Sequence, residues 1–330
     1  MAEHDDSDIA RVLRAAGERT SPSDEMTRAV YDAVRTEWLA TVERQRHKRS
    51  QRVWIALAAS VTVAAVALFF ARLFIHAPGE LMAEVNRSIG LVQVRDDDSS
   101  DWLTVANPKA LRVGERIHTS MDGRLTLALR DGVSLRLDHD TSITLAGVDR
   151  VDVTSGAVYV DSGVAGTSAA GLQVGTPAGI VRHLGTQYEA RILGSGTRIR
   201  VREGRVDVMP ANGPSRTLEV GDQVLVRNSG EEERSRIEPS NDEWDWASNA
   251  APDFDMDGKP AQDFLAWATR ETGLKLVYAT TETAAEARRV VLSGSIAGLD
   301  PDEALAAVLP TTNFKGTEKD GQLVIEMTTR

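Results

Sequence analysis

The hydrophobic and polar positions of this chain follow different patterns in consecutive regions. Before about residue 52, apolar residues recur at helical spacing, which is typical of amphipathic helices. Residues 53–71 then form an uncharged run in which Ser60 and Thr62 are the most polar residues. From about residue 91 to residue 226, apolar residues alternate with polar ones, which predicts β-strands. Helical and strand patterns both occur after residue 253, so the sequence predicts several regions of different architecture.

The apolar run Val53–Ala71 contains no charged side chain, and as a helix it is about 28 Å long at about 1.5 Å per residue. The hydrocarbon core of a bilayer is about 30 Å thick. Leu73–Ile75 can extend the helix beyond Arg72, because the long arginine side chain can reach the membrane surface. The sequence therefore predicts one transmembrane helix over residues 53–75. A buried helix of a soluble protein is the alternative.

Basic residues lie on one side of this predicted helix. Arg72 alone follows the run closely, whereas the basic residues just before it are Arg44, Arg46, Lys48, Arg49 and Arg52. The positive-inside rule then places the N-terminus in the cytoplasm and the remainder of the chain outside. The same basic run fits contact with anionic membrane lipid, and a nucleic-acid patch is the alternative interpretation.

The charge is distributed unevenly between the two sides. Residues 1–52 hold ten basic and ten acidic side chains, whereas residues 73–330 hold 27 basic and 39 acidic ones. The predicted exported part is therefore acidic, which argues against direct binding of nucleic acid. The chain contains no cysteine, which excludes disulfides, thiolate zinc sites and a cysteine nucleophile. This part must then be stable by packing alone.

Residues 7–47 are predicted to form two helices. Ser21 is the expected N-cap of the second helix, with Pro22 at its first position. The apolar stripe of that helix includes Tyr31, Val34, Trp38 and Val42. So short a segment cannot bury this stripe well by itself. The two helices either pack on each other, or a cytoplasmic partner covers the stripe with Trp38 as an anchor.

The alternation over residues 91–227 predicts an all-β domain. Leu125, Leu127 and Leu129 alternate with polar residues, and Asp131-Gly132 is a hairpin signal before the next alternating run. Further short strands and turns follow, with no helix-length pattern between them. A sandwich, a jelly roll and a β-solenoid all fit this pattern, which periodicity cannot separate. Residues 76–90 are interpreted as a connector to this domain.

Two further regions complete the predicted organisation. Residues 228–252 are charged and rich in turn formers, and are interpreted as a linker whose Trp244 and Trp246 dock on a neighbouring domain. Residues 253–330 predict a small α+β domain. Its expected elements are a helix over 260–272, strands over 274–278 and 290–292, a helix that starts at Asp300 and a final strand over 323–326.

The sequence contains no conventional catalytic or metal-binding pattern. Asp253, Asp255 and Asp257 begin like a calcium loop, but Phe264 replaces the glutamate that such a loop needs at its twelfth position. In Asp138-His139-Asp140, strand alternation sends the histidine to the face opposite the aspartates. We therefore expect no metal, no cofactor and no enzyme active site.

One dipeptide has chemistry of its own. Leu184-Gly185-Thr186 precedes a predicted strand. A threonine hydroxyl can attack the carbonyl of the preceding glycine and give an ester that water hydrolyses. Gly185 and Thr186 are therefore a candidate self-cleavage site, and an ordinary tight turn is the alternative.

Several ordered segments resemble the periplasmic domain of FecR-type transmembrane anti-sigma regulators. They lie at residues 125–143, 155–160, 174–191 and 201–208, within a resemblance that spans about 90–226. Residues 254–278 and 291–309 are similar to the small domain shared by the N-termini of secretins and TonB-dependent transducers (the STN domain). Within residues 1–52 the match is limited to Glu37-Trp38-Leu39.

This resemblance implies a multidomain regulator of the bacterial inner membrane. Its short cytoplasmic helical segment, residues 1–52, would bind an extracytoplasmic-function sigma factor through the stripe that contains Trp38. The periplasmic β-domain and the C-terminal α+β domain would sense the signalling domain of an outer-membrane transducer, often one occupied by an iron-siderophore complex. Some members of the family are cut at a Gly-Thr bond, which corresponds to Gly185-Thr186 here.

A function of another class also fits the sequence. In this alternative the chain is an envelope scaffold or a membrane protein that binds cell-wall polysaccharide, without a sigma partner. The β-domain would then bind the cell-wall ligand and the N-terminal helices would only dimerise. Capture of a sigma factor by residues 1–50 distinguishes the two hypotheses.

Overall fold

The structure is a computed structural model, which divides the chain into two compact units, Met1–Ala77 and Pro78–Arg330. Short stretches between residues 11 and 35 are described in the first unit. In the second unit the described residues are 80–96, 99–105, 109–163, 171–183, 185–210 and 213–328.

In the first unit, the described residues from 24 to 35 are helical. Ser23 caps this helix, because its Oγ accepts a hydrogen bond from the backbone N–H of Met26 at 3.4 Å. The cap is therefore Ser23 and not Ser21, which the sequence predicted. Both serines fit the preference for a hydroxyl at this position, and sequence alone does not choose between residues two positions apart.

The predicted fold class, a membrane protein with one transmembrane helix, requires a correction. The described part of the chain is mostly β-sheet, and none of its helices is both long and apolar enough to cross a membrane. The predicted span over residues 53–75 lies outside the described residues. The prediction rested on the hydropathy and length of that run alone.

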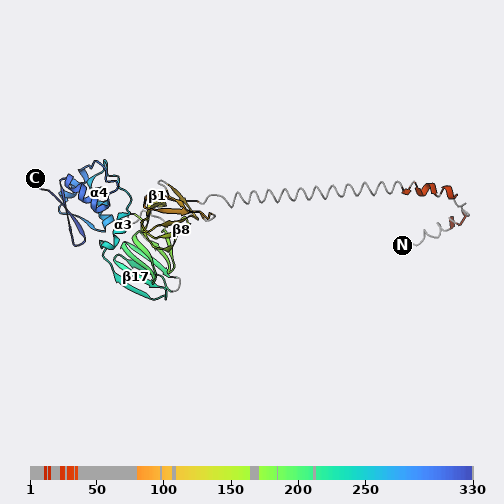
Figure 1. Cartoon of the computed structure of the whole chain (residues 1–330), viewed down its shortest axis with the longest axis horizontal. Coiled ribbons are helices and arrows are strands. Elements are labelled where there is room, and N and C mark those ends of the chain that lie inside the picture. Colours follow the sequence, from red (N-terminus) through yellow and green to blue (C-terminus); the bar gives the residue numbers. More distant parts are fainter. Residues whose placement is uncertain are drawn as a thin grey trace. The chain divides into compact units, whose positions relative to one another are not determined.

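The second unit contains two nine-stranded sheets, which we call sheet A and sheet B (Figure 1). Sheet A contains β1 (Leu81–Ile89), β4 (Ala110–Arg112), β6 (Arg124–Leu129), β7 (Ser134–Leu137), β10 (Ala157–Asp161), β13 (Gln187–Leu193), β14 (Gly196–Glu203), β17 (Asp222–Arg227) and β18 (Glu232–Arg236). Sheet B contains β2 (Val92–Arg95), β3 (Leu103–Thr104), β5 (Arg116–Thr119), β8 (Ser142–Gly147), β9 (Arg150–Ser155), β11 (Gln173–Thr176), β12 (Gly179–His183), β15 (Arg205–Pro210) and β16 (Arg216–Glu219).

The chain passes back and forth between the two sheets and advances along both. The strand order is β18-β17-β14-β13-β10-β7-β6-β1-β4 in sheet A and β16-β15-β12-β11-β9-β8-β5-β2-β3 in sheet B. From β5 onward, each order follows the sequence, and within these two sheets neighbouring strands pair antiparallel except for β9 with β11. Of the three architectures that the sequence left open, two sheets around one shared core are those of a β-sandwich. Apolar side chains of both sheets, such as Leu135 and Val158 of sheet A and Val151 of sheet B, form one core.

The prediction of a connector over residues 76–90 was wrong, because β1 occupies most of this segment. Its residues Leu81–Ile89 pair with β4 and β6 inside sheet A. The register shifts between Val85 and Arg87, which is a β-bulge or a similar irregularity. This shift breaks the alternation of buried and exposed positions, which explains why the segment does not look like a strand in the sequence.

The prediction of a linker over residues 228–252 was wrong at its beginning, because β18 lies there. Glu232–Arg236 is an edge strand with almost no apolar side chain, and it pairs with β17. Its charged residues form ion pairs with both sheets, Glu232 with Arg216 of β16 and Glu233 with Arg227 of β17. Charged side chains are typical of protected edge strands, although they resemble a linker in the sequence.

The remainder of the predicted linker lies on sheet A. The short helices η2 (Asp242–Trp244) and α3 (Asp245–Asn249) bring two tryptophans to this sheet. Trp244 is fully buried and its ring lies edge-on to that of Tyr159 in β10. Figure 1 draws α3 between the strands of the β-domain and the C-terminal domain. The segment therefore covers the face of sheet A that lies opposite the shared core.

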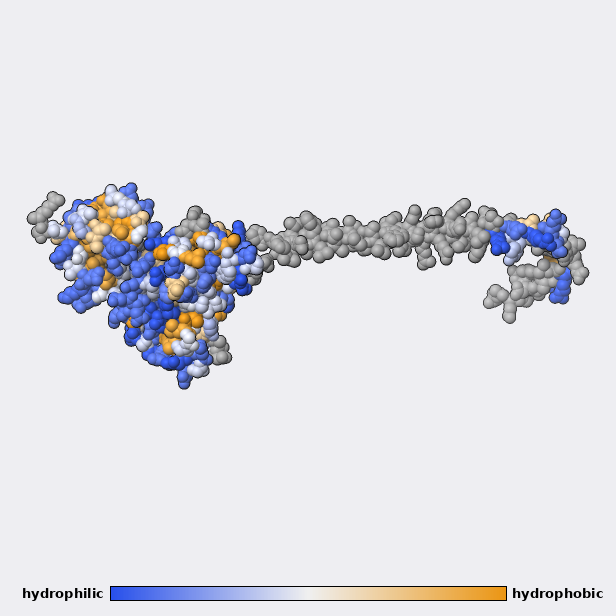
Figure 2. Space-filling model, in the orientation of Figure 1, coloured by the Kyte–Doolittle hydropathy of each residue, from blue (hydrophilic) through white to orange (hydrophobic). Residues whose placement is uncertain are grey.

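The C-terminal α+β domain has its own apolar core. Its elements are α4 (Ala261–Thr272), β19 (Lys275–Tyr278), α5 (Thr281–Arg289), α6 (Pro301–Val308), η3 (Leu309–Thr311), β20 (Phe314–Lys319) and β21 (Gln322–Met327). The strand order is β19-β21-β20. Hydrophobic residues gather in patches on the visible face of this domain (Figure 2).

Two parts of this domain differ from the prediction. Residues 290–292 are not a strand, because Val291 forms only an isolated bridge with Pro260. α5 and β20 were not expected from the sequence, since both are short and rich in charged or polar residues. By contrast, the start of α6 follows its sequence signal: Asp300 and Glu303 form a capping box, with Pro301 in the first turn.

Candidate functional site

The Gly185–Thr186 bond lies where the chain leaves β12 of sheet B and enters β13 of sheet A. Gly185 has a φ of 72°, a conformation that favours glycine. Its carbonyl oxygen lies close to Gly204, where an added Cβ would come within 2.3 Å of that oxygen. Both glycines are therefore needed for the chain to cross between the sheets at this point.

Thr186 is fully buried and held by Ser162, which follows β10. The Thr186 N–H donates a hydrogen bond to Ser162 Oγ at 2.6 Å. In return, the Ser162 N–H and Oγ both donate to the Thr186 carbonyl oxygen at 3.1 Å. The Thr186 hydroxyl is buried and has no hydrogen-bond partner among the described residues. Ser162 thus fixes the backbone of Thr186, whereas the Thr186 hydroxyl forms no hydrogen bond with a described residue.

Arg270, at the end of α4, connects the C-terminal domain to this site. Its guanidinium pairs with the carboxylate of Asp161, next to Ser162, and donates to the carbonyl oxygen of Gly163 at 2.8 Å. It also pairs with Glu203, next to Gly204. Arg270 therefore fixes the residues on both sides of the serine that holds Thr186.

A second arginine, Arg136 of β7, binds the neighbouring residue of α4. Arg136 is fully buried, and its two terminal nitrogens donate to both carboxylate oxygens of Glu271 at 2.7 and 2.9 Å. It also donates to the carbonyl oxygen of Ala247 in α3 at 2.7 Å. Paired, planar contacts of this kind are strong and set a definite orientation. They attach the C-terminal domain and α3 to sheet A.

Burial and charge have opposite effects on the pKa values of these carboxyls. Burial raises the pKa of Asp161, but Arg270 and Arg136 outweigh it and hold this pKa below its usual value. Burial also raises the pKa of Glu189, but Arg200, Arg191 and Arg198 lower it further than burial raises it. Both carboxylates are therefore charged at neutral pH, as a buried ion pair requires.

Tyr159 lies beside this network and is fully buried. Burial raises the pKa of Tyr159 to about 12, although Arg202 and Arg136 oppose the shift. Its hydroxyl has no hydrogen-bond partner among the described residues. The ring lies 5.1 Å from the Arg136 guanidinium, so Tyr159 packs beneath the charged groups as a neutral phenol.

The sequence-predicted sigma-binding residues lie in the first unit. Tyr31 and Val34 are on its described helix and are 71% and 62% exposed. Met26 and Val30 on the same helix are exposed as well. Trp38 and Val42 lie outside the described residues. This helix therefore presents apolar side chains that its described neighbours do not cover.

The roles of Arg136, Ser162, Arg270 and Glu271 were not predicted from the sequence. Arg136 alternates with Leu135 and Leu137 in β7, a pattern that usually places an arginine in solvent. Arg270 and Glu271 look like the polar end of an amphipathic helix. An available signal was the aromatic pair Trp244 and Trp246, since large aromatics in a charged linker indicate a face that must be covered.

Neither of the considered metal motifs forms a metal-binding group in the described part of the chain. Asp138 binds Arg124 and Arg191, which explains its burial. Asp257 Oδ1 accepts a hydrogen bond from the Gly294 N–H at 3.1 Å, so it fixes a loop. Both aspartates therefore have structural contacts of their own.

Part of the β-domain matches a known family model. Residues 115–207 match the family model described as FecR protein. The resemblance that the sequence predicted is therefore confirmed over these residues. No curated protein matches the chain.

Two crystal structures of a candidate anti-sigma factor from Parabacteroides distasonis, at 2.50 and 1.65 Å resolution, are similar to the chain. Each is 16% identical in sequence, with a TM-score of 0.34. The similarity covers 65% of this chain and 99% of the other.

Proposed function

We propose that this chain, which carries a FecR domain, is an anti-sigma regulator. The FecR match over residues 115–207 is the observation that carries the proposal. In this role the N-terminal segment holds a sigma factor, and the unit Pro78–Arg330 receives the signal that changes this hold. The function is regulatory, and any chemical step is confined to the chain itself.

The proposed sigma-binding surface is the apolar stripe that contains Tyr31, Val34, Trp38 and Val42. Its described members, Tyr31 and Val34, are both largely exposed. Exposed aromatic and branched side chains at helical spacing are typical of a helix that binds in a groove of a partner. The partner we propose is an extracytoplasmic-function sigma factor.

Co-purification tests this surface. The whole chain is co-expressed with each extracytoplasmic-function sigma factor of the same genome, and the complexes are isolated through a tag on the chain. Trp38→Ala should abolish capture, whereas Thr36→Ala, a polar position that the apolar pattern leaves out of the stripe, should not. Failure of the unchanged chain to capture any of them would contradict the proposal.

The proposed signal is contact with the periplasmic signalling domain of an outer-membrane transducer. The C-terminal domain is suited to receive it, because Arg270 and Arg136 link this domain to the β-domain through buried ion pairs. The similarity to secretin and transducer N-termini stays a prediction. So does the localisation in the bacterial inner membrane, with the N-terminus in the cytoplasm and the bulk of the chain in the periplasm, which fractionation tests.

We also propose that the chain cuts itself between Gly185 and Thr186. Thr186 Oγ bonds to the Gly185 carbonyl carbon, the C–N bond breaks, and the hydroxyl proton is transferred to the Thr186 nitrogen. Water then hydrolyses the ester and leaves a Gly185 carboxylate and a Thr186 amine. The Thr186 hydroxyl, which has no hydrogen-bond partner among the described residues, supports this step, and Ser162 holds the Thr186 nitrogen in place through the N–H···Oγ bond of 2.6 Å.

Cleavage is measured on a denaturing gel, because β13 pairs with β10 and would keep the fragments together under native conditions. The unchanged chain should give two fragments that meet at Gly185–Thr186. Thr186→Ser keeps a hydroxyl and should still be cut, whereas Thr186→Ala should stay whole and Ser162→Ala should be cut more slowly. An uncut unchanged chain would exclude the step and leave the sigma-binding proposal intact.

A further inference from the structure

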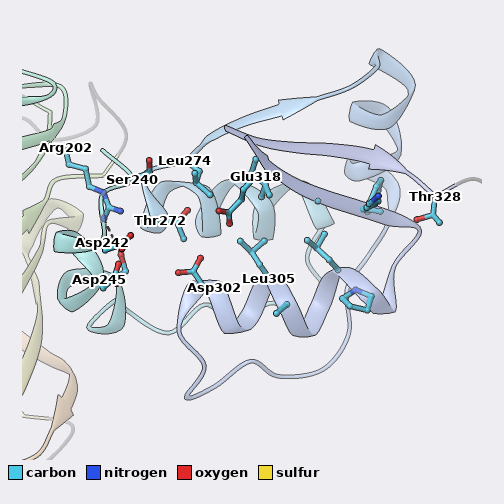
Figure 3. A pocket seen from close by; sticks show the side chains of 18 residues that line it. Arg202, Ser240, Asp242, Asp245, Thr272, Leu274, Asp302, Leu305, Glu318 and Thr328 are labelled. Atoms are coloured by element: carbon cyan, nitrogen blue, oxygen red, sulfur yellow. Dashed lines mark hydrogen bonds between the residues drawn. The ribbon is translucent and has the colours of Figure 1, made fainter. Parts of the chain in front are cut away.

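A groove of about 710 Å³ lies along α6 in the C-terminal domain (Figure 3). One wall is α6 with η3, and the other is formed by β20 and β21. Leucine and phenylalanine side chains make its floor: Leu274, Leu305, Leu309, Phe314 and Leu323. Apolar clefts of this size that are lined by a few polar groups are typical of binding sites.

Gly316 of β20 helps to keep the groove open. A Cβ at this position would come within 2.8 Å of Leu309 Cδ1 and 3.2 Å of Leu323 Cδ1. Any larger residue would therefore push into the floor or close the space between α6 and β20. The groove thus depends on the absence of a side chain at this position.

One end of the groove is acidic. The carboxylates that line it are Asp242, Asp245, Asp302 and Glu318. Figure 3 draws Asp242, Asp245 and Asp302 together at the Arg202 end, with Glu318 on the opposite wall. None of the four forms an ion pair with another described residue. The groove therefore combines an apolar floor with unpaired negative charge.

The nearest cation, Arg202, opposes the raised pKa values of Asp245 and Asp302 but forms no ion pair with either carboxylate. Arg202 donates to the Pro239 carbonyl oxygen at 2.7 Å and to Ser248 Oγ, and its guanidinium lies 5.4 Å from the ring of Trp244. Lys315 also lines the groove, but its register partner is Glu326, near the Thr328 end. The pKa of Asp302 is raised, by burial first and then by Asp300, Glu318 and Asp245.

β20 offers a backbone edge beside the groove. It pairs with β21 and, in the described part of the chain, with no other strand. An extended peptide can add to such an edge and place alternate side chains in the cleft between the strand and a helix. A compact ligand would use only part of this arrangement, and an anion would be repelled by the acidic end.

We propose that the groove between α6 and β20 binds an extended peptide of the signalling partner. The peptide adds a strand to β20, places apolar side chains on the floor at Leu305 and Leu323, and places a lysine or arginine at Asp302 and Glu318. This inference rests on the proposed function only for the identity of the partner. The chemistry of the peptide follows from the groove itself.

The test uses the full-length protein and a phage-displayed library of random short peptides. Bound phage are sequenced after selection, with counter-selection on the Ala306→Trp variant. Ala306 is an exposed residue that lines the groove, so tryptophan there fills it from outside. Enriched peptides should alternate apolar residues and carry lysine or arginine near one end. An acidic consensus, or no enrichment, would overturn the proposal.

Affinities of a selected peptide for matched variants complete the test. Ala306→Trp, and separately the double variant Asp302→Asn/Glu318→Gln, should each weaken binding about tenfold or more. Ala307→Trp, one residue further on the same helix and outside the groove, and Glu326→Gln should leave it within about twofold. Equal binding to all variants would overturn the proposal.

The double charge variant still decides the question if Ala306→Trp does not fold. Sigma-factor capture by the same variants is measured in parallel. Loss of peptide binding with intact capture would separate the groove from the sigma-binding surface.

Discussion

Sheets A and B show the same alternation of apolar and polar residues but differ in what lies on their outer faces, opposite the shared core. On sheet B, Arg150 and Asp152 of β9 are 41% and 40% exposed and pair with each other in solvent. On sheet A, the corresponding charged positions are almost fully buried: Arg136, Glu189, Arg200 and Arg202. α3, Trp244 and the end of α4 cover this face. A polar position in a strand thus becomes buried wherever another segment covers the sheet.

Burial on sheet A makes each charge dependent on its partners. Glu189 accepts from the guanidinium groups of Arg191, Arg198 and Arg200 and from the Trp246 indole N–H. On sheet B, water can replace the partner of Arg150. The outer face of sheet A is therefore specific for its cover, whereas that of sheet B carries no comparable constraint.

The largest expected difference between the faces is the response to loss of one arginine. Arg136→Ala leaves Glu271 buried without its partner, so the free energy of unfolding should fall by about 3–5 kcal/mol. Arg150→Ala should cost less than about 1 kcal/mol, because the pair is exposed to water. Urea denaturation followed by tryptophan fluorescence measures both.

The double variant Arg136→Met/Glu271→Met separates an unpaired charge from a lost contact. Apolar residues of similar size often replace a buried ion pair without loss of stability. We expect this variant to be clearly more stable than Arg136→Ala. Equal losses in the two variants would mean that the contacts of Arg136, and not the uncompensated charge, hold the domains together.

Acidification should destabilise the contacts on the outer face of sheet A, and by less than Arg136→Ala does. Asp161 and Glu189 have pKa values that are lowered in the folded protein, whereas the unfolded values are about 3.9 and 4.3. The folded state therefore binds fewer protons, and this stabilisation is fully present above the unfolded values. This stabilisation is lost as the pH falls below about 4 and passes through the lowered pKa values of Asp161 and Glu189 in the folded protein.

Urea midpoints between neutral pH and about pH 3 test this dependence. We expect the unchanged protein to lose stability steeply below about pH 4, together with the contacts of α4. Asp161→Asn should show a shallower loss, because it removes one of the two lowered carboxyls. The same slope in both proteins would assign the acid sensitivity to other groups.

The sequence predicted those elements whose local signals agree with their tertiary contacts. Leu125 and Leu127 alternate and face the core, and Asp300 to Glu303 cap α6 as their residue types indicate. The bulge at Val85–Arg87 hid β1, and the charged residues of β18 resembled a linker. Both strands were missed for one reason: the local pattern of residues does not show which neighbouring strand will form hydrogen bonds with a segment.

The candidate site was predicted only in part, for the same reason. Gly185 and Thr186 stand out because their chemistry is local to one bond. Ser162 and Arg270 act on that bond from 24 and 84 residues away in the chain, as their hydrogen bonds to Thr186 and Gly163-Asp161 indicate. Ser162 meets Thr186 only because β10 and β13 pair, and Arg270 arrives only with the C-terminal domain, so no spacing rule in the sequence connects these positions.

The smallest expected effect has the opposite sign and concerns the groove. Interface carboxylates such as Asp161 are surrounded by arginines, whereas Asp302 lies among other carboxylates and has a raised pKa. Asp302→Asn removes this repulsion and the partial loss of water around the charge, so at neutral pH it should stabilise the free protein, by less than about 0.5 kcal/mol because the residue keeps much of its contact with water. Asp161→Asn should destabilise it. If Asp302→Asn also destabilised the protein, its carboxylate would have a stabilising partner, and the groove would not be the unpaired acidic surface that a cationic peptide requires.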